Sequence, residues 1–100
     1  MRFDEMDDDA SRDFVNSHDC AQLSQLDLKQ IHQLVLNMFS GVCGDDDEQA
    51  ILKLLRCQSG ARVQQLVAMP GMSVEDFDDN VDGDEWDELE QLFKSHGIST

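Results

Sequence analysis

Asp27-Leu-Lys-Gln-Ile-His-Gln-Leu-Val-Leu-Asn-Met-Phe-Ser-Gly41 is the longest stretch of this sequence with the pattern of one amphipathic helix. Asp27 and Gln30 have the spacing of a capping box at its start, and Gly41 supplies a left-handed stop at its end. Six apolar side chains fall on one face at helical spacing: Leu28, Ile31, Leu34, Val35, Met38 and Phe39. This is the widest apolar face in the chain, so we expect the other helices to pack on it.

Four further segments follow with the apolar spacing and boundary residues of shorter helices. The five predicted helices cover residues 27–41, 45–57, 59–69, 73–82 and 84–96. Nothing in the sequence has the pattern of a strand, and connections this short force neighbouring helices to pack together. The sequence therefore predicts an all-α fold, a compact bundle of about five helices.

The predicted helix boundaries depend on a few residues. We expect Ser59, Ser73 and Asp84 to cap the last three helices, and Gly83 to close the fourth. The run Asp45-Asp46-Asp47-Glu48 has capping-box spacing between its first and last members, and carboxylates there suit the positive end of the helix dipole. This acidic run is therefore explained mainly as the start of the second helix.

Residues 1–22 form either an acidic N-terminal arm or an extra short helix, ahead of a single helical domain over residues 23–100. Four apolar residues at loose helical spacing favour the helix: Phe3, Met6, Ala10 and Phe14. The self-repelling run Asp7-Asp8-Asp9 favours the frayed arm instead. The sequence leaves both possibilities open.

The charge of the chain is strongly negative and unevenly distributed. The net charge is −15, with −5 in residues 1–22, −1 in residues 23–69 and −9 in residues 70–100. Such a surface repels nucleic acid and anionic lipid, so we expect neither as a direct partner. It favours a cationic partner, either a basic protein or metal ions, although an acidic surface also serves solubility alone.

The three cysteines, Cys20, Cys43 and Cys57, match no zinc-binding spacing. The start of the chain has no apolar run typical of a signal peptide, and no stretch is long and apolar enough to span a bilayer. We therefore expect a cytoplasmic protein whose cysteines are reduced thiols and small core residues.

The order of helices from Leu28 to Gly97 resembles one annexin repeat. The long helix ends in the glycine-containing loop Ser40-Gly-Val-Cys-Gly44, a short third helix begins at Ser59, and the fourth ends at Asp82-Gly83. The resemblance implies five helices, four of them coiled together with the third crossing. It also implies calcium binding by carbonyls of the loop and by a carboxylate near Asn80, from Asp79 or Asp82, and through calcium a membrane contact. The loop is one residue longer than in that family, with Asp45 where threonine is expected.

A second calcium-like motif is Asp78-Asp-Asn-Val-Asp-Gly83, the first half of an EF-hand loop. Its candidate ligands are Asp78, Asn80 and Asp82, but Leu89 stands where the bidentate glutamate is required. We therefore predict no dedicated metal site and no cofactor, with weak divalent-cation binding as the alternative.

The sequence does not suggest an enzyme. His18, His32 and His96 are scattered, and no serine, cysteine or lysine stands in a nucleophile motif. Paired carboxylates are so frequent in this chain that they select no catalytic pair. We expect no catalytic residues.

The leading functional hypothesis is an acidic binding protein for a basic protein partner, most concretely an immunity protein that neutralises a cationic bacterial toxin such as a nuclease. The residues expected to bind the partner are Asp78, Asp79, Asp82, Asp84, Glu85, Asp87 and Glu88. The alternatives are an annexin-like calcium-dependent membrane or metal-binding module, and an inhibitor that mimics nucleic acid. A further possibility is a binding surface in the nearly neutral middle, with Met38, Val42 and Met69 exposed.

Overall fold

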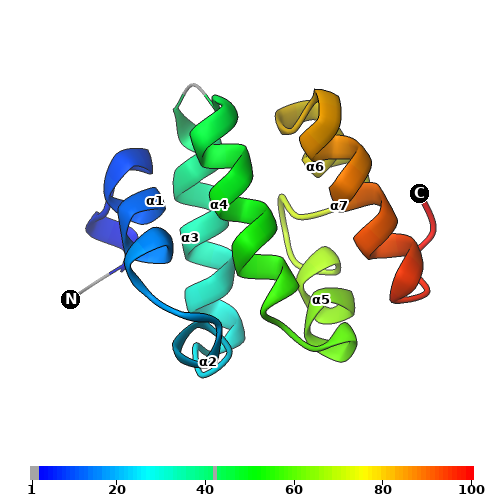
Figure 1. Ribbon diagram of the computed structural model, residues 1–100, viewed down its shortest axis with the longest axis horizontal. Coiled ribbons are helices and arrows are strands. Elements are labelled where there is room, and N and C mark those ends of the chain that lie inside the picture. The colour runs from blue at the N-terminus through cyan, green and yellow to red at the C-terminus, as the bar shows by residue number, and fades with distance from the viewer. Residues whose placement is uncertain (1–2, 42) are drawn as a thin grey trace.

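Short helices joined by tight turns form the secondary structure of the computed structural model, which describes residues 3–41 and 43–100. These residues contain no strand. The helices are η1 (Phe3–Glu5), α1 (Asp8–Ser17), α2 (Cys20–Leu23), α3 (Leu28–Ser40), α4 (Asp45–Arg56), α5 (Gly60–Val67), α6 (Val74–Asn80) and α7 (Gly83–Ser95) (Figure 1). The predicted all-α class is confirmed, and the five predicted helices correspond to α3–α7. The likeness of their arrangement to an annexin repeat stays a prediction.

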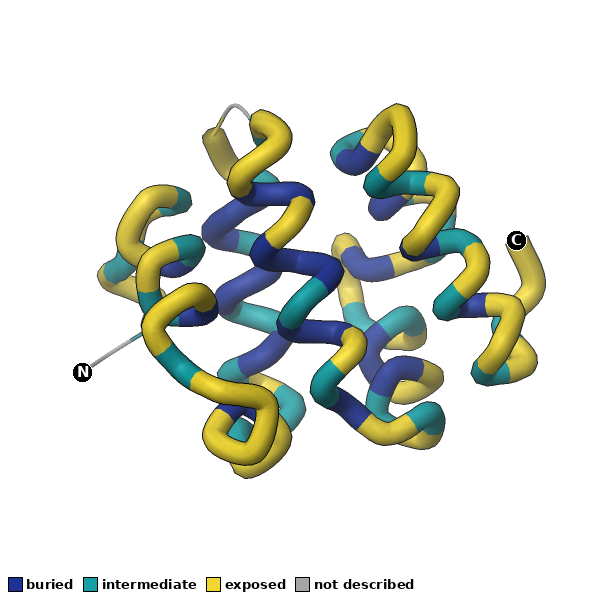
Figure 2. The backbone as a smooth tube through the Cα atoms, in the orientation of Figure 1, coloured by how far each residue is buried: buried dark blue, intermediate teal, exposed yellow. Residues whose placement is uncertain are grey.

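Helices α3 and α4 form the centre of the molecule, with α1 on one flank and α6 and α7 on the other (Figure 1). The buried positions concentrate along these two helices (Figure 2). The predicted apolar face of α3 is confirmed, because Ile31, Leu34, Val35 and Met38 have no exposed surface. The expectation that Met38 is exposed for binding is therefore wrong. Met69 is half-buried, and Val42 lies outside the described residues.

The N-terminal segment is helical and docked on the centre. Helix α1 packs on α3 and α4 through Ser11 and Val15, which are both fully buried. The amide of Asn37 donates hydrogen bonds to the Phe3 carbonyl (2.7 Å) and the Ser11 hydroxyl (3.0 Å). In the described part of residues 1–22, the short-helix alternative holds, because a buried face and polar bonds offset the repulsion among its aspartates.

A lysine of α4 fixes the end of α1. The ammonium group of Lys53 donates to the carbonyls of Val15 (2.9 Å) and His18 (2.8 Å). The last carbonyls of a helix have no intrahelical donor, and a cation there also complements the helix dipole. Lys53 therefore holds α1 against α4 by a charged cap.

Several predicted helix caps and stops are confirmed and four are wrong. Capping boxes join Asp27 to Gln30 and Ser73 to Asp76, and Ser59 caps α5. The N-cap of α7 is Asp82 rather than Asp84, because Gly83, at φ +60°, is already the first residue of that helix and does not close the helix before it.

The other two corrections flank the α3–α4 loop. Gly41 is extended (φ −102°) rather than left-handed, and α4 begins after Gly44 with no side-chain cap. The predicted capping box between Asp45 and Glu48 is therefore absent. Glu48 instead turns to a neighbouring element, as described below.

The cysteine prediction is wrong for two residues. Cys20 and Cys57 form a disulfide that links the start of α2 to the end of α4. Cys20 is exposed and not a core residue, and only Cys43 is a free thiol among the three. The pairing was not recognisable from spacing, because the fold brings together residues that are 37 positions apart. Disulfides persist mainly in oxidising compartments, and the cytoplasmic location stays a prediction.

None of the helices in the described residues has the length and apolar character needed to cross a membrane.

Candidate functional site

Carboxylates from two distant segments meet where α4 and α7 begin, at the upper edge of the view in Figure 1. We call this surface the acidic end: Asp45, Asp46, Glu48, Asp82, Asp84 and Glu85. The backbone N–H of Asp82 donates to Oε2 of Glu48 at 3.3 Å, and the amide of Gln49 donates to Oε1 of Glu85 at 2.9 Å. Two hydrogen bonds thus join the first turns of α4 to the α6–α7 turn, at Asp82, and to the first turn of α7, at Glu85.

Glu48 is the buried member of the acidic end, with a relative exposure of 1 %. Desolvation raises its pKa to about 7. The backbone N–H of Asp82 opposes that shift, while the carboxylates of Asp82 and Glu85 add to it. Desolvation also raises the pKa of the nearby Cys43 thiol to about 12, with Asp47, Glu48 and other acids adding to the shift. Burial, with the neighbouring carboxylates adding to it, therefore favours the protonated form of both groups.

The structure places the predicted partner-binding residues around the end of α6 and the first turns of α7. Six are exposed and Glu85 is half-buried: Asp78, Asp79, Asp82, Asp84, Glu85, Asp87 and Glu88. Glu88 is already paired with Arg56 of α4 at 3.5 Å. Among the described residues, no ion pair involves Asp82, Asp84 or Glu85. The predicted set therefore extends over two helices, and only its α7 side joins the acids of α4.

Sequence reasoning missed the contribution of α4 to this site. The run Asp45–Glu48 was explained as a helix start, and that explanation holds for its position. Nothing in the spacing indicated that Glu48 contacts the α6–α7 turn, because that contact joins residues 34 positions apart.

The candidate metal ligands Asp78, Asn80 and Asp82 do not form a calcium loop in the structure. The side-chain amide of Asn80 donates to the Asp76 carbonyl (2.8 Å), Asp82 is the N-cap of α7, and Leu89 is buried. In the described residues, the one group of acids close enough to share an ion is Asp45, Glu48 and Glu85, with ligand oxygens within 4.8 Å of one another. Oxygen ligands suit hard cations, but a proton competes for Glu48 near neutral pH.

A pocket of about 870 Å³ lies along α1, on the flank away from α7. We call it the α1 pocket: Glu5, Met6, Asp7, Ala10, Asp13, Phe14, Ser17 and His18. The ring of Phe14 packs edge-on against Phe3 (centroids 5.0 Å apart) and stacks on His18 (4.1 Å). The apolar spacing of Met6, Ala10 and Phe14 was visible in the sequence, but it indicated only a possible helix and no pocket.

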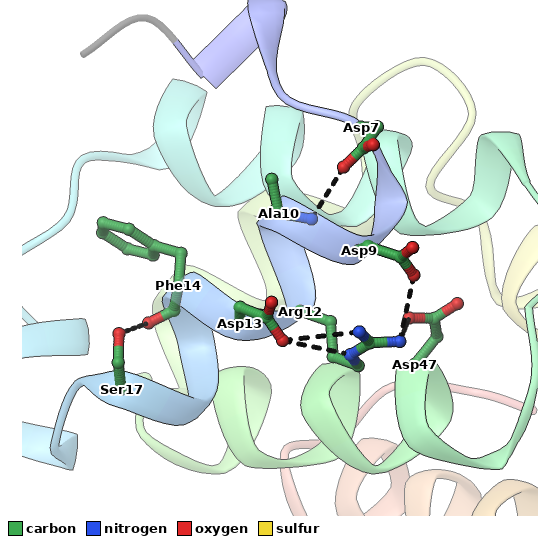
Figure 3. Close-up of polar contacts among 8 residues, drawn as sticks. All are labelled: Asp7, Asp9, Ala10, Arg12, Asp13, Phe14, Ser17 and Asp47. Atoms are coloured by element: carbon green, nitrogen blue, oxygen red, sulfur yellow. Dashed lines mark hydrogen bonds and ion pairs between the residues drawn. The ribbon is translucent and has the colours of Figure 1, made fainter.

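A half-buried arginine of α1, Arg12, contacts three carboxylates, of which only Asp47 is buried. Arg12 lies 3.1 Å from Asp9, 3.4 Å from Asp13 and 3.8 Å from Asp47 of α4 (Figure 3). Asp47 is 4 % exposed, and its Oδ1 has no hydrogen-bond partner in the described residues. Desolvation raises the pKa of Asp47, the Asp8 carboxylate adds to the shift, and Arg12 opposes it. Phe14 points to the other side of α1, so the pocket does not include Arg12 or Asp47 (Figure 3).

Comparison with protein-family models, with curated proteins and with solved structures gives no match for this chain. The resemblance to an annexin repeat therefore stays a prediction.

Proposed function

We propose that this chain is a non-enzymatic acidic binding protein that engages a basic protein through the acidic end and the adjoining acids of α6 and α7. In its most concrete form it is an immunity protein or inhibitor that neutralises a cationic bacterial toxin, such as a nuclease. The supporting observation is that exposed carboxylates at the start of α4 and at the start of α7 lie on one surface, where the Glu48 and Gln49 hydrogen bonds join the two segments.

The distribution of basic side chains supports this proposal. Lys53 is used to cap α1, Arg12 lies among acids of α1 and α4, and Lys94 pairs with Glu90 at 3.8 Å. In the described residues, no ion pair offsets the charge of Asp45, Asp84 or Glu85. A partner rich in lysine and arginine would supply the missing counter-charge, and long-range attraction would speed its association.

The test uses a double charge reversal with a matched control. Asp84→Lys/Asp87→Lys changes two exposed acids of α7, and Asp9→Lys/Glu75→Lys changes two exposed acids elsewhere by the same net charge. The protein encoded beside this chain is co-expressed and co-purified with each variant, and binding is measured by calorimetry in low and in high salt. We expect the α7 reversal to weaken binding about tenfold or more, and the control to change it about twofold or less.

Equal binding by the two variants, or binding that salt does not weaken, would refute the proposed surface. A growth-rescue assay then tests the immunity role separately. It compares cells that express the neighbouring protein alone with cells that express both proteins, and rescue requires that the neighbouring protein be toxic by itself.

A divalent cation competes for the same carboxylates, as the annexin-like alternative requires. Calorimetry with calcium chloride, together with co-sedimentation with anionic vesicles, distinguishes this alternative from protein binding. The nucleic-acid mimic uses the same charged surface and differs only in its partner. If the partner is a nucleic-acid-binding enzyme, duplex DNA should compete with this chain for it.

A further inference from the structure

We propose that the α1 pocket is a docking site for a basic amphipathic helix of a partner protein, separate from the acidic end.

The chemistry of the pocket has two parts. The apolar part of its lining, which we call the floor, is formed by Met6, Ala10 and Phe14, and its acidic part, which we call the rim, by the exposed carboxylates of Asp7 and Asp13. Arg12 lies 3.4 Å from Asp13 and offsets part of this charge. Met6 and Phe14 are half-buried, so each still offers apolar surface to solvent. An apolar floor takes apolar side chains, and an acidic rim takes lysine and arginine beside them. That pattern is typical of one face and the flanks of a basic amphipathic helix.

The pocket is held in shape by the rest of the fold. Lys53 caps α1, Asn37 bonds both η1 and α1, and Asp7 caps the first turn of α1 by accepting from Ala10 N–H at 2.7 Å. Figure 3 shows this cap, and it shows that the Phe14 side chain projects from the side of α1 opposite Arg12 and Asp47. A surface fixed in advance loses little conformational entropy on binding, which favours a specific partner.

The length of α1 sets the size of the occupant. Its ten residues extend over about 15 Å, which matches about three turns of a partner helix. Charge excludes the other occupants of an apolar pocket. A second copy of this chain would add −15 to a surface that is already acidic, and an anionic membrane would be repelled.

This site and the proposed acidic end can fail independently. α1 lies on one flank of α3 and α4 while α7 lies on the other, and the two surfaces share no residue (Figure 1). Substitutions in one surface therefore leave the other unchanged, so each can be tested in the same full-length chain.

The experiment uses a synthetic peptide of about 14 residues, built from lysine and leucine with all leucines on one helical face. Two control peptides have the same composition in scrambled order, or glutamate in place of lysine. Binding to the full chain is followed by the amide NMR signals of Ala10, Asp13 and Ser17 as peptide is added. We expect these signals to shift with the amphipathic peptide and to remain in place with both controls.

Two matched variants test the position of the site. Ala10→Lys places a cation in the pocket, and Ala61→Lys makes the same change at an exposed first-turn position of α5. We expect Ala10→Lys to weaken peptide binding about tenfold and Ala61→Lys to change it about twofold or less. Ser17→Lys, at the other end of the pocket, provides the same test if Ala10→Lys does not fold.

Three outcomes would overturn the proposal. The α1 signals could stay unshifted by the amphipathic peptide, the scrambled peptide could bind as tightly, or both pocket variants could bind like the unmodified chain. Signals that shift with protein concentration in the absence of peptide would indicate a second copy as the occupant, and would also overturn it.

Discussion

The acidic end and the α1 pocket are both negatively charged, yet they are built in different ways. The acidic end gathers carboxylates from the starts of α4 and α7 and buries one of them, Glu48. The α1 pocket instead surrounds an apolar floor with exposed acids from a single helix and the segment before it. The comparison shows that net charge alone does not describe how this chain can bind. A partner of the acidic end gains mainly Coulomb attraction, which salt screens, whereas a partner of the α1 pocket also buries apolar surface.

The largest expected effect on stability comes from the disulfide. Because it links α2, which follows α1, to the end of α4, we expect it to stabilise the flank that carries the α1 pocket. Replacing Cys20 and Cys57 by serine opens a closed loop with a sequence separation of 37. The chain-entropy model gives a loss of about 4 kcal/mol in the free energy of unfolding. Urea denaturation measures this loss, and hydrogen exchange should show more opening in α1 and α2 than in α6 and α7. Cys43→Ser is the control, and equal opening on both flanks would contradict the expected asymmetry.

The second effect concerns buried charge at the acidic end. The raised pKa of Glu48, about 7 against a usual 4.5, means that the folded chain holds this proton more tightly than the unfolded chain. The resulting stability is fully present below about pH 4.5 and is lost as the pH rises through about 7. Asp47 contributes in the same direction. We expect Glu48→Gln to raise the free energy of unfolding at about pH 8 by up to about 3 kcal/mol.

Urea denaturation at about pH 5 and about pH 8 measures the pH dependence of both proteins. Glutamine keeps a carbonyl oxygen that can accept from Asp82 N–H, so the substitution removes charge and preserves the bond. Glu75→Gln, at an exposed position in the first turn of α6, is the control. A stability that falls as steeply with pH in Glu48→Gln as in the unmodified chain would contradict the assignment.

The third effect tests how α1 is held, and therefore how well the α1 pocket is formed. Lys53→Met keeps the apolar stem but leaves the carbonyls of Val15 and His18 without their charged donor. We expect a loss of about 2 kcal/mol, because bonds to a charged group are stronger than neutral ones. Lys94→Met, which removes only an exposed pair with Glu90, should cost less than about 1 kcal/mol. Similar losses for the two variants would show that the cap does not stabilise α1.

The parts of the fold that were predictable from sequence are those set by local pattern. The apolar period of α3, the capping box at Asp27 and the caps at Ser59 and Ser73 each depend on residues a few positions apart. Gly97 is left-handed at φ +75°, and Ile98 N–H donates to the Phe93 carbonyl as a Schellman turn requires. These features are fixed by backbone geometry and do not require knowledge of the tertiary contacts.

The parts that were missed depend on contacts between distant segments. The disulfide, the Lys53 cap and the Glu48 bond to Asp82 each join residues more than thirty positions apart. The cysteines were explained as small core residues and Glu48 as an acid in a first turn. Lys53 stands in the last turn of α4, where a cation suits the helix dipole without any distant contact. The local explanation for Lys53 and Glu48 accounts for their place on a helix, but it does not identify the element that they contact.

The smallest expected effect separates charge from burial within the acidic end. Glu85→Gln removes one of the carboxylates that raise the pKa of Glu48, while the new amide oxygen can still accept from Gln49. The pKa of Glu48 should therefore fall, with a change in stability of less than about 1 kcal/mol because Glu85 is partly solvated. Carboxyl ¹³C NMR titration follows Glu48 directly, and Asp87→Asn, at an exposed position of α7, is the control. If the Glu48 pKa is unchanged in Glu85→Gln, desolvation and Asp82 set it, and Glu85 of α7 does not act together with the acids of α4. If it falls, the carboxylates of the two helices share one electrostatic site, and a basic partner that docks on either helix should lower the Glu48 pKa further.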